Sequence, residues 1–286
     1  MQNKTVLITG GTGGIGKQTA LALAKLGAHV IVTGRHQGNG ETAINELKQL
    51  SGNSKIDLLL ADLSLQADAR AIAQQFKHKY DHLDVLINNA GAAEPQRRLT
   101  ADGIETDFAV NVVTPFLLTY LLMDCLKTSP SARVVTLSGG EHPSQIDLDN
   151  LQGERSFVGL TAYSHSKLVM MAVMYEFAQR LPGSSVTINV CYPGQASTVM
   201  TRSVTPDMMP GFLRLIFPIY KLATRADQGQ SAAKASQASV YLASAPEVQS
   251  VTGKYFNPQC KIVDWPKPVL DPSIRQPLWR RVEQLI

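Results

Sequence analysis

The chain has 286 residues, of which 44% are hydrophobic and 17% charged, so it can bury a core large enough for one soluble globular domain. Its net charge of +4 is small and its basic residues are scattered, which argues against a nucleic-acid partner. The longest apolar stretches, residues 115–123 and 168–174, are shorter than the roughly 18 residues that a transmembrane helix needs.

The start of the chain and its cysteines indicate a cytoplasmic protein. Residues 1–4 lead directly into an apolar run, and we expect no signal peptide. Cys125, Cys191 and Cys260 are odd in number, widely spaced and set in apolar runs. We predict that they are buried free thiols in a reducing compartment and that the chain binds no metal.

Apolar runs alternate with helical patterns along the whole chain, which predicts an α/β fold with a parallel sheet covered by helices on both faces. The predicted strands are residues 4–9, 29–34, 56–61, 84–88, 132–137, 186–191 and about 254–256. The predicted helices are residues 13–26, 40–50, 66–79, 102–127, 163–180 and 228–243. Because the strands are almost continuously apolar, we expect both faces of each strand to be buried. We expect residues 1–286 to form a single domain.

The first predicted strand is followed by a glycine-rich turn and a helix. Residues 9–16 read Thr-Gly-Gly-Thr-Gly-Gly-Ile-Gly. A helix start offers unpaired N–H groups and the positive end of a dipole, and the missing side chains of Gly10, Gly14 and Gly16 let a pyrophosphate approach the backbone. The turn therefore predicts a dinucleotide site; the alternative is a flexible turn before an ordinary helix. A Walker phosphate loop is excluded because Gln18 stands where that pattern needs Ser or Thr.

The residues after the second predicted strand indicate which dinucleotide binds. An acidic residue there would bind the ribose hydroxyls of NAD, whereas an arginine can pair with the extra phosphate of NADP. This strand ends with Gly34 and Arg35, and no acidic residue follows before Glu41. We predict NADP(H), with Arg35 on the 2′-phosphate; the alternative is a solvent-facing arginine in a loop.

Tyr163 and Lys167 stand four residues apart in a predicted helix, which places the phenol and the ammonium group side by side on one face. The lysine stabilises the phenolate and lowers the pKa of the tyrosine toward the working pH, where the phenol can donate or accept a proton. The pair therefore predicts a general acid, although the same spacing also occurs on solvated helix faces.

Together and in this order, the turn at residues 9–16 and Tyr-x-x-x-Lys at residues 163–167 resemble the short-chain dehydrogenase/reductase family. Further matching segments are Asp62-Leu63, Asn88-Asn89-Ala90-Gly91, Asn111, Pro193-Gly194 and Thr198. The short segments 14–17, 34–35, 116–119 and 253–256 resemble the retinol dehydrogenase and protochlorophyllide reductase-like branch. The resemblance implies a Rossmann-type doubly wound sheet of seven strands, in the order 3-2-1-4-5-6-7, with ligands beyond the carboxyl ends of the strands.

The resemblance also implies a role for each matching residue. The residues implied to bind the cofactor are Gly10, Thr12, Gly13, Gly14, Ile15, Gly16, Arg35, Asp62, Leu63, Asn89, Ala90, Gly91, Tyr163, Lys167, Pro193, Gly194 and Thr198. In the family's mechanism a tyrosine protonates the carbonyl oxygen as hydride arrives, a lysine holds the ribose, and an asparagine anchors a proton-relay water. The residues in these catalytic positions are Tyr163, Lys167 and Asn111.

At the end of the fifth predicted strand the sequence departs from the family. Relatives of this branch have two adjacent serines there, of which the second is catalytic, whereas this chain has Ser138 followed by Gly139 and Gly140. Neighbouring residues of a strand point to opposite faces, so Ser138 is not expected to replace the serine missing at Gly139. Loss of one such donor typically lowers the rate by a factor on the order of 10² to 10³, which slows an enzyme without abolishing turnover.

Three interpretations follow from the missing serine. The chain acts on a carbonyl or alcohol, with Ser138, Ser144, His142 or the substrate supplying the hydrogen bond; or it reduces a conjugated double bond, which does not need that donor. In the third interpretation it is a non-redox cyclase or isomerase, or an NADP(H)-binding regulatory protein.

The substrate is expected to contact residues 195–227, which form a lid in the resembling family. This segment is rich in methionine and aromatic residues, which predicts a hydrophobic substrate. The predicted substrate residues are Ser138, Gly139, Gly140, Met200 and Phe212. The same apolar residues could instead pack a helix pair or a dimer seam, or rest on a membrane surface.

The C-terminal arm, residues 257–286, contains two tryptophans and four prolines from residue 265 onward and is predicted to be irregular, covering the sheet edge or the site. A homodimer or homotetramer is common among relatives, but no motif in the sequence establishes one.

Overall fold

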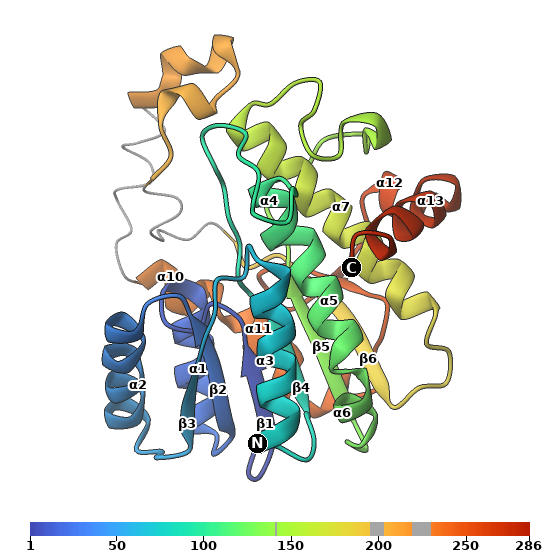
Figure 1. Cartoon of the computed structure of the whole chain (residues 1–286). Coiled ribbons are helices and arrows are strands. Elements are labelled where there is room, and N and C mark those ends of the chain that lie inside the picture. The colour runs from blue at the N-terminus through green and yellow to red at the C-terminus, as the bar shows by residue number, and fades with distance from the viewer. Residues whose placement is uncertain (141, 195–202, 219–229) are drawn as a thin grey trace.

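The computed structural model describes residues 1–140, 142–194, 203–218 and 230–286, and they include one eight-stranded sheet (Figure 1). The strands are β1 Thr5–Ile8, β2 His29–Gly34, β3 Ile56–Leu60, β4 Val85–Asn88, β5 Ala132–Leu137, β6 Val186–Cys191, β7 Tyr255–Phe256 and β8 Ile262–Val263. Their order is β3-β2-β1-β4-β5-β6-β7-β8, and all neighbours pair in parallel except β7 and β8. The predicted order is confirmed, and the short antiparallel β8 is an addition at the edge.

Both faces of the sheet are buried, as the apolar strands predict. Within β1, Leu7 belongs to one core cluster, while its neighbours Val6 and Ile8 belong to the other. This alternation follows from the two-residue period of a strand. One cluster is covered by α3 (Gln66–Lys79), α5 (Thr114–Leu121) and α7 (Gly159–Gln179). The other is covered by α1 (Gly14–Lys25), α2 (Gln37–Ser51), α10 (Gln230–Ala235) and α11 (Gln237–Ser244) (Figure 1).

The prediction of one helix over residues 102–127 is wrong. The segment is divided into α4 (Thr106–Phe108), the π turn η1 (Ala109–Val113), α5 and α6 (Met123–Lys127). Pro115 has no N–H and cannot donate to the carbonyl of Asn111 four residues earlier, so an α-helical ladder is interrupted here. The π turn lies at this interruption, and turns of this kind are frequent at functional sites.

The prediction that the C-terminal arm is irregular is also wrong. After β8 the chain forms α12 (Lys267–Leu270) and α13 (Pro272–Glu283), and both pack on α7 (Figure 1). Pro272 occupies the first turn of α13, where a missing N–H is harmless, and the Asp271 carboxylate caps that turn by accepting from Ser273 N. Prolines in the sequence thus mark the start of a helix here rather than the absence of one.

The three cysteines are free, but only two of them are buried. Cys125 and Cys191 lie in the core, as predicted, whereas Cys260 is partly exposed in the turn between β7 and β8, with a φ of 60°. The left-handed backbone places Cys260 in a turn between Gln259 and Lys261, so the prediction that it is buried is wrong.

Candidate active site

The glycine turn joins β1 to α1 at the carboxyl edge of the sheet. Gly10 and Gly14 have positive φ angles of 65° and 52°, a conformation that favours glycine. A Cβ at Gly16 would stand 2.4 Å from both Asn89 Nδ2 and the Gly10 carbonyl oxygen, so a side chain there would clash. No side chain of the described residues caps the start of α1 at Gly13. Its first N–H groups can therefore bind an anion, and the turn fits a diphosphate.

Asn89 and Thr9 fasten this turn to the end of β4. Asn89 Nδ2 donates to the Thr9 carbonyl at 2.8 Å, and Thr9 Oγ1 accepts from Asn89 N at 2.9 Å and Ala90 N at 3.0 Å. The amide of Asn89 thus shapes the cofactor turn. Thr9 was not among the predicted site residues, although its place at the head of the glycine motif was a usable signal.

The end of β2 lies against the same turn. Gly10 N donates to Thr33 Oγ1 at 3.0 Å, and a Cβ at Gly34 would approach Thr12 Cγ2 to 2.6 Å. Arg35, the next residue, is exposed beside this contact. Ile15 is partly buried in the first turn of α1 and packs against the core on that face. Arg35 therefore directly follows the strand end that contacts the glycine turn.

Asp62 and Leu63 follow β3 at the same edge. The Asp62 carboxylate accepts from Ser64 N at 3.0 Å and Ser64 Oγ at 2.8 Å. The Leu63 carbonyl accepts from Thr114 Oγ1 at 2.7 Å, which joins this loop to α5. The structure thus gathers the ends of β1, β2, β3 and β4, as the topology requires.

Tyr163 and Lys167 lie together on α7, as their spacing predicts. Lys167 is only 4% exposed; its Nζ donates to the Leu137 carbonyl at 3.1 Å and lies 5.9 Å from the centre of the Tyr163 ring. Burial lowers the pKa of Lys167 to about 8, although the charge of Asp107 acts in the opposite direction. A Cβ at Gly91 would lie 3.4 Å from Nζ, so the end of β4 borders this ammonium group.

Asn111 is fully buried in the π turn and connects three segments. Its Nδ2 donates to the Ala92 carbonyl and to Ser166 Oγ, both at 2.9 Å, while its Oδ1 accepts from Ala92 N at 2.9 Å. Both amide hydrogens are therefore used to hold the end of β4 against α7.

The residues directly after the carboxyl end of β5 show how the missing serine changes the site. A Cβ at Gly139 would meet Lys167 Cγ at 3.2 Å and Tyr163 Cε1 at 3.4 Å, so position 139 faces the tyrosine. Ser138 is buried on the other side, where its Oγ lies 3.3 Å from the Cys191 carbonyl and 3.4 Å from Tyr255 Oη. This geometry supports the assignment of Gly139 to the serine position.

Asp107 is a buried group of this site that the sequence did not reveal. It is fully buried; its Oδ1 accepts from Glu94 N at 2.9 Å, and its Oδ2 has no hydrogen-bond partner among the described residues. Burial, and then the charge of Glu105, raise the pKa of Asp107 to about 8. Nothing in the local sequence marks Asp107, because its burial depends on contacts of α4 with α7 and the loop after β4.

The end of β6 and the predicted lid complete the surroundings. Gly194 has a φ of 84° and stands beside Pro258, and a Cβ at Gly140 would lie 3.0 Å from Tyr192 Oη. Thr198 and Met200 lie outside the described residues, and the side chain of Phe212 in η4 (Gly211–Ile216) is not described. Within η3 (Pro206–Met208), Met208 is buried close to Gly159 at the start of α7.

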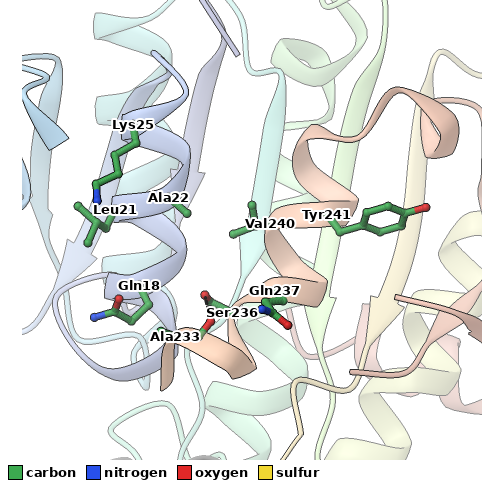
Figure 2. A pocket seen from close by; sticks show the side chains of 9 residues that line it. All are labelled: Gln18, Leu21, Ala22, Lys25, Ala233, Ser236, Gln237, Val240 and Tyr241. Carbon is green, nitrogen blue, oxygen red and sulfur yellow. Dashed lines mark hydrogen bonds between the residues drawn. The ribbon is translucent and has the colours of Figure 1, made fainter. Parts of the chain in front are cut away.

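A separate groove of about 420 Å³ lies between α1 and the α10–α11 segment (Figure 2). It is lined by Gln18, Leu21, Ala22, Lys25, Ala233, Ser236, Gln237, Val240 and Tyr241. None of the predicted site residues belongs to this lining, so the groove is not part of the candidate active site.

Two features are absent from residues 1–140, 142–194, 203–218 and 230–286. No group of His, Cys, Asp or Glu in those ranges could hold a metal ion. None of the helices in the same ranges combines the length and hydropathy needed to cross a bilayer.

The sheet order, the glycine turn at α1 and the buried Lys167 beside Tyr163 define an oxidoreductase that uses a nicotinamide cofactor. Residues 4–209, more than half of the chain, match the short chain dehydrogenase family, and the chain belongs to that family.

Curated relatives place the chain near the retinol dehydrogenases. Human retinol dehydrogenase 14 is 35% identical over 300 residues, which cover 100% of this chain and 87% of that protein. Mouse retinol dehydrogenase 12 is 38% identical over 259 residues, covering 90% and 78% respectively. Human polyprenol dehydrogenase is 36% identical over 261 residues, covering 89% and 76%.

Solved structures agree with this fold. A crystal structure of an uncharacterised protein from Mycobacterium paratuberculosis is similar with a TM-score of 0.76 and 26% identity, covering 99% of this chain and 93% of that one. The RhlG/NADP active-site complex of Pseudomonas aeruginosa has a TM-score of 0.64 and 26% identity, covering 90% and 95%.

Proposed function

We propose that this chain is an NADP(H)-dependent oxidoreductase that transfers hydride to or from a hydrophobic carbonyl or alcohol, with Tyr163 as general acid and base. The observation that carries the proposal is the placement of Tyr163 beside a buried Lys167 at the same sheet edge as the glycine turn. When bound, the cofactor would supply or accept the hydride at its nicotinamide ring.

The choice of NADP(H) rests on charge. Arg35 is exposed directly after β2, whose last residue, Gly34, lies against Thr12 of the glycine turn, and no acidic residue follows before Glu41. An arginine can bind a phosphate with two parallel hydrogen bonds, whereas NAD lacks that phosphate. The similar RhlG structure contains NADP, which supports the same choice. Equal dissociation constants for NADPH and NADH would remove this part of the proposal.

Each catalytic residue has a task that its surroundings support. Tyr163 gives its phenolic proton to the carbonyl oxygen in reduction and takes it back in oxidation. Lys167 keeps its ammonium group close to the phenol and favours the phenolate by its charge. Asn111 holds the loop after β4 through Ala92, and in the proposed mechanism it anchors a water that replaces the proton of Tyr163.

The substrate is proposed to be apolar. Its contacts would come from the lid at residues 195–227, of which Met208 is buried close to Gly159 at the start of α7. Adaptable methionine side chains suit a hydrophobic ligand. Relatives named retinol dehydrogenase and polyprenol dehydrogenase carry names of long apolar alcohols, which supports the same class.

The test is NADPH oxidation by the purified chain with all-trans-retinal and a panel of apolar aldehydes, ketones and enones. We expect a product two mass units heavier than the substrate, and we expect Tyr163→Phe to lower the rate by a factor on the order of 10² or more. Tyr175→Phe, on the same helix but packed against Trp265, is the matched control and should keep the rate. An unchanged rate in Tyr163→Phe, with NADPH still bound, would contradict the mechanism.

A second candidate is reduction of a conjugated carbon–carbon double bond. It is favoured by Gly139, since a conjugated substrate needs no serine at that position. Product analysis separates the two reactions, because an allylic alcohol marks carbonyl reduction and a saturated ketone marks double-bond reduction. Binding of NADPH without any oxidation would favour a non-redox enzyme or a regulatory protein.

Cellular location and assembly remain part of this proposal. The free cysteines support a cytoplasmic location. A homodimer or homotetramer stays a prediction, and so does contact of the lid with a membrane surface.

A further inference from the structure

His142 lies on the loop between β5 and α7, three residues after Gly139. Both of its ring nitrogens are buried, and neither has a hydrogen-bond partner among the described residues. Buried polar groups are nearly always paired, because an unpaired N–H loses its hydration without compensation. The ring of His142 therefore has hydrogen-bonding capacity that the described residues do not use.

His142 lies on the loop that begins at the catalytic pair. A Cβ at Gly139, three residues before His142, would meet Tyr163 and Lys167. Burial, and then the charge of Lys167, lower the pKa of His142. Near neutral pH the ring is therefore neutral, with one N–H donor and one acceptor nitrogen.

The other polar side chains named for this role are less suitable. Ser138 Oγ lies on the opposite side of β5, near the Cys191 carbonyl and Tyr255 Oη. Ser144 is exposed. His165 Nε2 accepts from Asp147 N at 3.0 Å and so holds the loop to α7.

We propose that His142 donates to the substrate carbonyl oxygen the hydrogen bond that a serine at position 139 would donate, and so acts as a catalytic residue beside Tyr163. The hydride and its electron pair bond to the carbonyl carbon, the π electrons move to oxygen, and Tyr163 gives that oxygen its proton. His142 keeps its own proton throughout, and its bond to oxygen strengthens as negative charge develops. The proposal rests on the proposed function and adds the donor that the sequence lacks.

The first experiment compares wild type, His142→Phe, Gly139→Ser and the double variant in NADPH-dependent reduction of all-trans-retinal. We expect His142→Phe to lower kcat by a factor on the order of 10² to 10³ while the Kd for NADPH changes less than about twofold. We expect Gly139→Ser to have a small effect alone and to restore at least about tenfold in the His142→Phe background, because the two residues supply one bond. His142→Asn, which keeps an N–H donor, should retain more activity than His142→Phe.

Tyr192 is the rival donor, since its hydroxyl lies close to Gly140. The proposal is overturned if Tyr192→Phe lowers kcat and Gly139→Ser restores it in that background, while His142→Phe leaves kcat unchanged. It is equally overturned if His142→Phe keeps kcat within about threefold of wild type, or if Gly139→Ser raises kcat by the same factor in both backgrounds.

A second readout does not depend on turnover. β-Ionone, an apolar ketone, is bound to the chain with NADP⁺, and the carbonyl stretching frequency is measured by infrared difference spectroscopy. A donated hydrogen bond lowers this frequency, so His142→Phe should move it upward and Gly139→Ser should move it down again. An unchanged frequency in His142→Phe contradicts the role of His142 but does not affect the proposed function. A wild-type chain that binds no NADPH, or none of these carbonyl compounds, contradicts the proposed function instead.

Discussion

Gly13 and Gly16 stand three residues apart in one turn but meet different surroundings. A Cβ at Gly16 would overlap the Gly10 carbonyl oxygen, whereas a Cβ at Gly13 would meet no described atom within 4 Å. The backbone at Gly13 is extended, with a φ of −154°, which any residue can adopt. Two glycines that look alike in the sequence therefore have different reasons to be present.

This difference gives a paired prediction. Gly16→Ala should destabilise the fold and weaken NADPH binding, because its methyl group would push the glycine turn away from Asn89. Gly13→Ala should leave the stability of the fold nearly unchanged. Thermal unfolding and NADPH fluorescence titration measure the two effects, and equal losses in both variants would show that steric contact at Gly16 is not the cause.

At the scale of elements, α13 depends on one aromatic anchor. Trp279 is 5% exposed, and its ring centre lies 4.8 Å from that of Phe116 in α5 and 5.2 Å from that of Phe177 in α7. Arg275 adds an ion pair to Glu176 of α7, with its Nε 2.8 Å from Oε2. The arm is therefore part of the core on this face of the sheet.

We expect Trp279→Ala to lower the free energy of unfolding by about 3–5 kcal/mol, because it leaves a cavity between α5, α7 and α13. Leu270→Ala is the control on the same arm, since Leu270 is 46% exposed and its loss should cost little. Urea unfolding followed by circular dichroism measures both. A cost below about 1 kcal/mol for Trp279→Ala would mean that α13 is not held by this cluster.

At the scale of the whole molecule, stability depends on ionisable groups enclosed near its centre. The pKa of Asp107 is raised to about 8 from an ordinary value of 3.8, chiefly by burial. Between these two pH values the unfolded chain loses the proton and the folded chain keeps it. The unfolded state then binds fewer protons, so Asp107 lowers the stability of the fold progressively as pH rises from about 4 to about 8.

Asp107→Asn should remove this dependence. The variant should resemble wild type near pH 4 and become more stable than wild type as pH rises, by up to about 1.4 kcal/mol per pH unit until about pH 8. Asp81→Asn, at an exposed position, is the control and should show no such trend. Urea unfolding at several pH values between 4 and 8 tests the prediction, and a constant difference between Asp107→Asn and wild type would contradict it.

The sequence by itself determined the features that short segments encode. The glycine turn, the helical spacing of Tyr163 and Lys167, and the near-continuous apolar strands depend on residues close in the chain, and the resemblance they carry gave the strand order. Only the tertiary structure decided which side chains are buried beyond the ends of the strands. Asp107 is buried on α4, which packs on α7, and the ring nitrogens of His142 are buried on the loop after β5. Ser138 turns toward Tyr255, and α13 packs on α7. Burial and hydrogen bonding between distant segments set these environments, and no local pattern of residues records them.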